Sequence, residues 1–377
     1  AVAGALRFVW NGHYLNDPQF PNGRAIEFRE CDPIVAECAY RVEDAYVEVQ
    51  LPYVRLFFGR MDRNWGLPGT NGLQLSSYSY SYDHIGYKFG SERVALTGLF
   101  VPFDDFKGDT TRYFSSHRFD WMIRDNLSVS VGESVVYGGE NRPINFAFTN
   151  PIGVWEIGAN PSGDTERNSM GLGEVWWRPF SNLVTYGSFV VDNTSVGDEE
   201  QGRVEGFNQF AAALGAQLPA LTPTLGLRFD FSVVNGLAYR SRIGFFEYYT
   251  LNSIGLARDK IDAVILFATA DWFARRGLVL QPGFELMWKG EDDLTDPFPD
   301  DAFTGRDNLL VGTVETTIRP VIGGRWHLSH PDLPWRGLSL DLDWDLGLNI
   351  VKNKDHQTAD WEVEGVGSVD LLVRQAF

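Results

Sequence analysis

The most regular feature of this chain is an alternation of apolar and polar residues with a period of two. It is clearest between Leu338 and Ile350, where seven large apolar residues occupy every second position. The positions between them include Asp341, Asp343 and Asp345. A helix would scatter both kinds of residue around its surface, whereas a strand separates them into an apolar face and an acidic face. The pattern therefore predicts a strand with one strongly polar side.

The same alternation recurs at 209–218, 225–233 and 278–288. Stretches of about ten residues are long enough for a tilted strand to cross a bilayer. Lipid offers no hydrogen-bonding partners, so a sheet of such strands must close on itself. Counting the plausible crossings gives roughly 16 to 18 strands.

Tight connections such as 274–277 alternate along the chain with long acidic ones such as 192–203 and 290–307. Short turns at one end and long loops at the other are typical of outer-membrane barrels. We therefore expect an all-β fold, a closed antiparallel transmembrane β-barrel, integral to the bacterial outer membrane of a Gram-negative cell. The long extracellular loops should partly occlude the lumen. The segment Pro143–Asp164 lacks alternation and is rich in Asn, Pro and aromatic residues, so we expect it to fold inward as a constriction.

The chain shows no break in composition or linker, so residues 1–377 are expected to form one domain, of which 1–46 is the least regular part. At the other end, Val369, Leu371, Val373 and Phe377 fall on one face of a last strand. A terminal Phe after such a strand resembles the signal by which the barrel-assembly machinery receives its clients. That machinery, outer-membrane lipid and lipopolysaccharide are therefore expected partners.

The charge balance narrows the possible partners. With 32 Lys and Arg against 50 Asp and Glu, the net charge is -18. Such a chain would be repelled by nucleic acid and would gain nothing from anionic lipid headgroups as a peripheral protein. Acidic groups can instead line a pore that favours cations.

The two cysteines, Cys31 and Cys38, enclose a short loop that contains Pro33. Such a pair forms a disulfide in an oxidising compartment, and the alternative is two unpaired thiols. A metal site is disfavoured because no His or further Cys lies nearby.

Several short motifs lie between Arg55 and Pro151. They are Phe58-Gly59-Arg60, Asn64-Trp65-Gly66, Arg112-Tyr113-Phe114, His117-Arg118, Glu133, Tyr137-Gly138-Gly139 and Asn150-Pro151. In this order and spacing they resemble the capsule-assembly Wzi family of outer-membrane proteins, over roughly a quarter of the chain. The resemblance implies a barrel of about eighteen strands that acts as a surface lectin and attaches capsular or exopolysaccharide to the cell. Members of that family also carry a helical bundle near the amino terminus, where this chain is short and strand-like.

Charged residues inside strand patterns are the first candidates for a network in the lumen. A charge that faces hydrocarbon at mid-depth costs about 2–4 kcal/mol. Arg60, Arg118 and Glu133 are therefore expected to point inward. There they would pair with one another or with the aspartates at 341, 343 and 345, and hold the shape of the barrel. Contact with a ligand is the alternative role.

Aromatic residues supply the candidates for glycan binding. Tyr78, Tyr80 and Tyr82 alternate with polar residues, as if they shared one face of a strand. Outward they would belong to the aromatic girdle, whereas inward or above the membrane they would offer flat faces and hydroxyls to sugar rings. Trp176 and Trp177 are adjacent and must lie on opposite faces, and Trp176 joins the glycan candidates.

No nucleophile, zinc-protease, phosphate-loop or dinucleotide motif is present, so we expect no enzyme activity and no cofactor. The acidic loop Glu291–Asp301 lacks the spacing of a calcium loop, and no metal site is expected. Three functions remain: binding of surface polysaccharide, a porin-type channel with an acidic lumen, and, as the weakest, an outer-membrane hydrolase.

The cysteines give a first prediction. Protein isolated from membranes should contain Cys31 and Cys38 oxidised to one another, since the compartment lacks a reducing thiol pool. Mass spectrometry after alkylation without reductant should find neither thiol labelled, and free alkylation of both would refute the pairing.

Overall fold

The computed structural model describes residues 5–14, 40–66, 70–79, 81–103, 109–155, 167–192, 209–242, 244, 248–251, 254–258, 260–302, 307–329 and 338–375. Five residues singled out above lie outside these ranges: Cys31, Pro33, Cys38, Tyr80 and Phe377. The disulfide and the carboxyl-terminal assembly signal therefore stay predictions.

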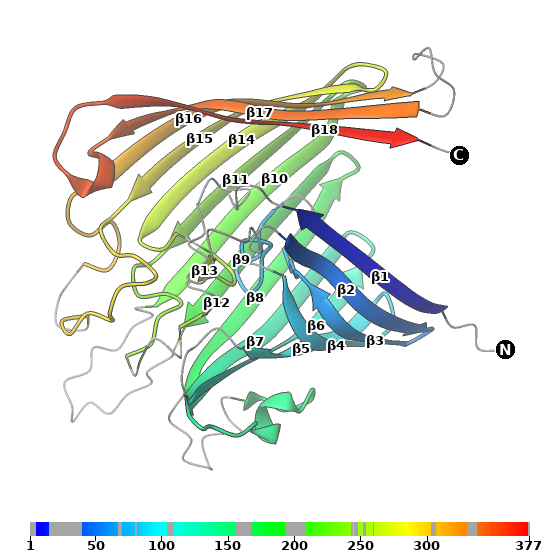
Figure 1. The fold of residues 1–377 in the computed structure, drawn as a ribbon, viewed down its shortest axis with the longest axis vertical. Coiled ribbons are helices and arrows are strands. Elements are labelled where there is room, and N and C mark those ends of the chain that lie inside the picture. Colours follow the sequence, from blue (N-terminus) through cyan, green and yellow to red (C-terminus); the bar gives the residue numbers. More distant parts are fainter. Residues whose placement is uncertain are drawn as a thin grey trace.

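Sixteen strands form one antiparallel sheet in which each strand pairs with the next, and β11 pairs with β14 across an inserted pair of short strands. The sheet curls round a central lumen, and its two end strands, β1 and β18, come round to the same side (Figure 1). This confirms the predicted antiparallel barrel and its strand number. The strands are β1 (Ala5–Tyr14), β2 (Tyr40–Leu51), β3 (Val54–Met61), β4 (Tyr82–Gly90), β5 (Val94–Phe103), β6 (Thr110–Arg124), β7 (Leu127–Glu140), β8 (Arg167–Phe180), β9 (Leu183–Asp192), β10 (Phe210–Thr222), β11 (Leu225–Val234), β14 (Ala263–Arg275), β15 (Leu278–Lys289), β16 (Glu315–Ser329), β17 (Leu338–Lys352) and β18 (Glu362–Gln375).

Two strands lie within residues 1–46, where the alternation was weakest: β1 and the first part of β2. The remaining described elements are short. β12 (Thr250–Leu251) and β13 (Ile254–Gly255) form a separate two-stranded sheet, and η2 (Phe146–Thr149) and η6 (Lys354–His356) are single 3-10 turns. No helix among the described residues is long and apolar enough to cross a membrane.

The connections differ in length between the two ends of the barrel. Two-residue turns join β2 to β3, β6 to β7, β8 to β9, β10 to β11 and β14 to β15. At the opposite end the chain makes long excursions after β3, β7, β9, β11 and β15. The first residue of β1 and the last residue of β18 lie at the short-turn end (Figure 1). In outer-membrane barrels this end faces the periplasm.

The two faces of the sheet differ as the alternation predicts. On β17, Leu346 and Leu348 are 48% and 47% exposed on the outer face. Asp341 and Asp343 lie on the other face, where they pair with His327 (2.5 Å) and Arg325 (2.7 Å) of β16. Residues that pair in register across neighbouring strands lie on the same face of the sheet. Followed from β17 through β16, β15 and β14, the face of these aspartates is the one that carries Val234 of β11, which is buried in the lumen.

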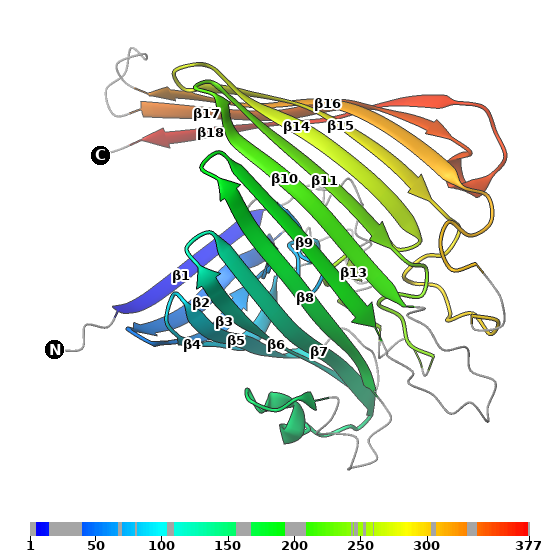
Figure 2. The same cartoon turned by 180° about the vertical axis from the view of Figure 1, so that it is seen from behind.

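Much of the lumen beside β4–β11 is filled by protein. Two excursions from the long-loop end, the described parts of residues 62–79 and 235–262, enter the barrel and pack on its inner wall (Figures 1 and 2). We call them the first and second inward loops. With the wall they form one hydrophobic core, whose members include Leu73, Leu75 and Tyr249 at 0–1% exposure. The expectation that long loops partly occlude the lumen is confirmed.

The two faces of β17 generate a prediction about assembly. Replacing Leu342 with Arg would put a charge among lipid chains and should cost about 2–4 kcal/mol at mid-depth. Asp343→Asn keeps a polar group on the lumen face beside Arg325 and should be tolerated. Folding of both variants into lipid vesicles, followed across a urea series, measures the difference. Equal stability of the two variants would contradict the assigned faces.

Candidate functional site

Tyrosine hydroxyls and one glutamine join the two inward loops to each other and to the wall. Tyr239 donates to the carbonyl of Leu73 at 2.8 Å, and Tyr249 donates to that of Gln74 at 2.7 Å. Burial raises the pKa of both tyrosines, so both stay protonated donors. The Gln74 amide donates in turn to the hydroxyls of Ser116 (3.0 Å) and Ser134 (2.8 Å) on β6 and β7.

Two arginines of β6 hold the backbones of the inward loops. Arg112, only 1% exposed, donates to the carbonyls of Tyr248 (2.7 Å) and Thr250 (3.1 Å) in the second loop. Arg118 donates to the carbonyl of Trp65 in the first loop at 2.5 Å. A buried guanidinium needs acceptors and counter-charge. Arg118 obtains its counter-charge from two wall carboxylates, those of Asp120 (2.6 Å) and Glu174 (3.1 Å).

The motif Asn64-Trp65-Gly66 shapes the start of the first inward loop. The Asn64 side chain accepts from the N–H of Gly66 (2.8 Å) and Gly72 (3.1 Å) and donates to the carbonyl of Thr70 (2.7 Å). A Cβ at Gly66 would lie 2.6 Å from the nitrogen of Gly72, so only glycine allows this close approach of backbones. The motif thus closes the loop on itself and fixes Trp65 in place.

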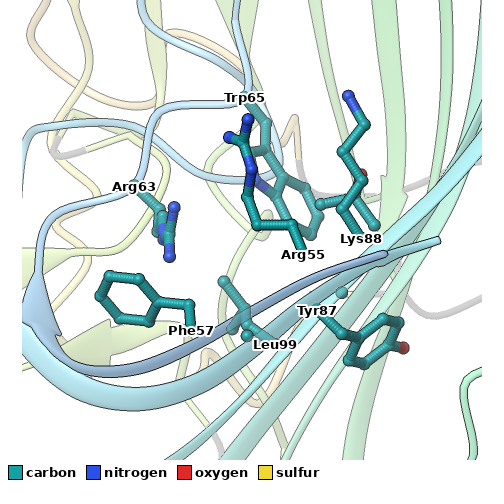
Figure 3. A pocket seen from close by; sticks show the side chains of 10 residues that line it. Arg55, Phe57, Arg63, Trp65, Tyr87, Lys88 and Leu99 are labelled. Atoms are coloured by element: carbon teal, nitrogen blue, oxygen red, sulfur yellow. The ribbon is translucent and has the colours of Figure 1, made fainter. Parts of the chain in front are cut away.

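Beneath that loop lies a pocket on the lumen face of β3, β4 and β5. It contains about 400 Å³ of space, part of it open to solvent. Figure 3 shows Arg55, Phe57, Arg63, Trp65 and Lys88 around this space, while the Tyr87 side chain points to the other side of the sheet. The remaining lining residues are Gly86, Thr97, Gly98 and Leu99.

Arg63 and Phe57 form the inner part of this pocket. The Arg63 guanidinium lies 4.2 Å from the centre of the Phe57 ring, and its Nε donates to Nε2 of His84 at 2.8 Å. That histidine is also within 2.9 Å of the Tyr82 carbonyl through Nδ1, which assigns its proton to Nδ1. Burial lowers the pKa of Arg63 because it disfavours the charged form, although the group stays protonated at neutral pH.

The pocket is electropositive in an acidic protein. Among the described residues, neither Arg63 nor Lys88 forms an ion pair, and Arg55 has one carboxylate nearby, that of Glu48 at 3.8 Å. Glu48 and Asp62 also act on the charge of Arg63, so three cations face two carboxylates around a space that is also lined by two aromatic side chains. This combination can bind an anion that carries an apolar or flat body.

Two of the charges expected in the lumen lie on the outer face of the barrel. Arg60 shares that face with Phe58, which is 67% exposed, and pairs with Asp83 at 2.5 Å. It is the last residue but one of β3, at the end of the wall, where a charge costs about 0–1 kcal/mol. The prediction that Arg60 points inward is wrong.

Glu133 is the second exception. Glu133 pairs in register with His117, and the next pair along the strands, Arg118 and Gly132, faces the lumen. Successive residues of a strand point to opposite faces, so Glu133 faces outward. Its carboxylate lies 3.6 Å from His117 and accepts the N–H of Trp155 at 2.8 Å. The predicted inward direction is therefore wrong, because a tertiary contact shields this charge from lipid.

The cover over Glu133 is the segment Asn141–Trp155, which we call the outer-wall segment. It leaves β7 and folds back along the outside of the barrel, where η2 lies clear of the lumen (Figures 1 and 2). Phe148 and Trp155 are 0% and 3% exposed against Val135 and Tyr137 of β7. The predicted inward constriction at Pro143–Asp164 is thus wrong for the described part, and the two inward loops occupy the lumen instead.

The aromatic glycan candidates are dispersed. Ser77–Ser79 form a turn rather than a strand, because Ser76 accepts the Tyr78 N–H and donates to Ala257 of the second loop. Tyr82 is 4% exposed in the lumen core, so it offers no face to a sugar. Trp176 faces the lumen opposite Tyr186, close to the short turns. Of the candidates that the structure describes, which exclude Tyr80, Tyr78 is the one that stays partly exposed at the long-loop side.

The acidic residues of β17 and those of the loop after β15 lie in different surroundings. The lumen face of Asp341 and Asp343 continues to Asp345, which is exposed. The loop after β15 packs on the second inward loop, where buried Arg240 donates to the carbonyl of Asp296 at 3.2 Å. Within the described ranges, no three His, Cys, Asp or Glu side chains gather as metal ligands would.

The sequence matches no protein-family model and no curated protein. The structure is similar to that of Wzi, a carbohydrate-binding β-barrel of the outer membrane involved in group 1 capsule assembly in Escherichia coli. The TM-score is 0.62 at 10% identity, over 90% of this chain and 71% of Wzi. Two outer-membrane proteins of Pseudomonas aeruginosa score lower. OprD has a TM-score of 0.46 at 12% identity, and the match covers 89% of this chain and 78% of OprD. OccD3 has a TM-score of 0.47 at 10% identity, and the match covers 90% of this chain and 79% of OccD3. The protein therefore has the fold of a Wzi-like β-barrel integral to the outer membrane.

The first inward loop yields a prediction. Asn64→Ala removes three exposed or partly buried hydrogen bonds within the loop, each of which should contribute about 0.5–1.5 kcal/mol. The loop should then open more often, so single-channel recordings should show more frequent conducting events than the wild type. Asn126→Ala, at a short turn on the opposite end, is the matched control. Identical traces for Asn64→Ala and wild type would show that the loop does not control access.

Proposed function

We propose that this protein binds acidic polysaccharide in its lumen and so retains such chains at the outer membrane. The observation that carries the proposal is the pocket beneath the first inward loop, with Arg55, Arg63 and Lys88 beside Phe57 and Trp65. Retention at the cell surface, as in a lectin, is the role that follows from a barrel built to bind.

The chemistry of the pocket suits one residue of an acidic sugar. A guanidinium offers paired donors to a carboxylate, and an ammonium adds a point charge. An indole provides a flat apolar face against a sugar ring, as amphipathic aromatic surfaces do elsewhere.

The packing of the lumen favours binding over free passage. Along β4–β11 the two inward loops are joined to the wall by buried hydrogen bonds and by a continuous apolar core. Rearranging such a core to open a wide pore would expose apolar side chains and unpair two buried arginines. Similarity to Wzi, a carbohydrate-binding barrel, supports the same interpretation.

A porin-type channel is the second candidate, and one observation favours it. The lumen face of β16 and β17 is not covered like the opposite wall, since Arg325 and Asp343 keep 69% and 43% of their side chains exposed. An open strip with exposed carboxylates could pass cations. Conductance therefore belongs in the test.

The test is binding of a short uronic-acid oligosaccharide to the purified barrel, measured by calorimetry beside a neutral oligosaccharide of equal length. Replacing Arg55 and Lys88 together with Gln should weaken uronate binding about tenfold or more, because each charged hydrogen bond contributes about 1.5–3 kcal/mol. Binding should also weaken as salt is raised.

Arg325→Gln is the matched control, since it removes a lumen cation on the opposite wall and should leave the affinity unchanged. Planar-bilayer recordings complete the test. Steady large conductance without binding of either oligosaccharide would identify a channel and refute the proposal.

A further inference from the structure

The outer-wall segment, residues 141–155, is fixed to the barrel at both of its ends. Near its start, the Tyr137 hydroxyl accepts the N–H of Asn145 at 3.3 Å. At its end, Trp155 donates its N–H to Glu133, and its ring lies 4.0 Å from that of His117. The ring of Phe148 packs at 4.8 Å on that of Tyr137 between these points. The segment is thus part of the outer surface.

Its other large side chains point away from the barrel. Ile144 is 41% exposed, Phe146 79%, Ile152 85% and Val154 56%. Residues 143–155 include no charged side chain, in a chain of which 22% is charged. The nearest cations given for the segment, Arg142 and Arg167, lie over the rings of Tyr137 and Phe148. The four exposed aliphatic and aromatic groups form a surface that water does not favour.

The depth of this surface decides what meets it. On the outer face of β6, Trp121 near the short turn lies eight positions along the strand from Tyr113. With a rise of about 3.3 Å per residue and a tilt of about 40°, the two residues are about 20 Å apart in depth. The apolar band of an outer-membrane barrel is about 25 Å tall. Trp121 is 48% exposed on that face. Tyr137, paired with Tyr113, therefore falls within the outward-leaflet part of the band, and Glu133, paired with His117 about 10 Å above Trp121, lies near its middle.

The backbone of the segment is adapted to such a place. Hydrocarbon offers no hydrogen bonds to irregular backbone, which is tolerated at membrane depth where protein buries it. The side chains of Asn145 and Asn150 accept from the N–H of Ala147 and Ile152 at 3.0 and 3.1 Å. The carbonyl of Asn150 accepts the Trp155 indole, and Pro143 and Pro151 have no N–H to satisfy. The segment exposes apolar side chains while it pairs part of its backbone internally.

We propose that the outer-wall segment is seated in the outer leaflet, with Phe146 and Ile152 inserted among lipid acyl chains. The surface is continuous with the lipid-facing side chains of Phe119 and Val131, which are 40% and 58% exposed just below it on the same face. That continuity favours lipid over a second protein. The segment then also keeps lipid away from the polar pair of His117 and Glu133, which are each 12% exposed.

The test places an environment-sensitive fluorophore on single cysteines in protein that carries serine at 31 and 38. Phe146→Cys and Ile152→Cys are labelled and folded into vesicles that contain lipids with a quencher on the acyl chain. Val131→Cys, on the exposed wall, is the lipid-facing control. Asp300→Cys, exposed in the loop after β15, is the aqueous control. Heat-modifiable mobility confirms that each labelled protein is folded.

Labels at 146 and 152 should show a blue-shifted emission and lose intensity to the acyl-chain quencher, as the label at 131 does. Emission like that at 300, without quenching, would place the segment in water and overturn the proposal. A blue shift without quenching that depends on the protein-to-lipid ratio would identify a second copy as the occupant, and would overturn it as well.

Discussion

Every strand of the wall depends on one constraint, that hydrocarbon offers no partner to a peptide N–H or C=O. The sheet meets it by pairing each strand with its neighbours in antiparallel register, and sixteen strands curl round before the two ends of the order are reached. Because lipid surrounds the wall, most of the outer face is apolar. Polar residues lie in the lumen, at the edge of the wall as Arg60 does, or under a protein cover as Glu133 does. The two-residue alternation along β17 is the direct result.

The lumen then poses the opposite problem, since inward polar groups need partners once loops displace water. Arg112 and Arg118 solve it by donating to loop carbonyls, and Arg118 takes its counter-charge from Asp120 and Glu174. A buried arginine with a full set of acceptors holds a backbone in one place, whereas an unpaired one would be strongly destabilising. The inward loops are consequently fixed to the wall rather than merely resting against it.

The same reasoning explains why the pocket beside Phe57 has an excess of positive charge. Elsewhere on the described lumen face, cations such as Arg325 and Arg118 are matched by carboxylates at hydrogen-bonding distance. Beside Phe57 the match is incomplete, and the Arg63 guanidinium is held between an aromatic ring and a neutral histidine. A desolvated cation without a strong anion nearby gains most from an anion supplied by a ligand. The net charge of the chain hides this local excess.

The sequence by itself determined the fold class, the approximate number of strands and the faces of β17, because alternation is a local property that a strand displays without reference to its neighbours. It also singled out Arg112, Arg118 and Asn64 through their motifs. The directions of Arg60 and Glu133 were decided by tertiary structure alone. Glu133 is sheltered by Trp155, 22 residues further along the chain, and a one-residue difference in register separates it from the lumen. Which loops enter the barrel was decided in the same way, by hydrogen bonds such as that from Tyr239 to Leu73, whose partners are 166 residues apart. The local periodicity of a sequence cannot show contacts between residues that are so far apart along the chain.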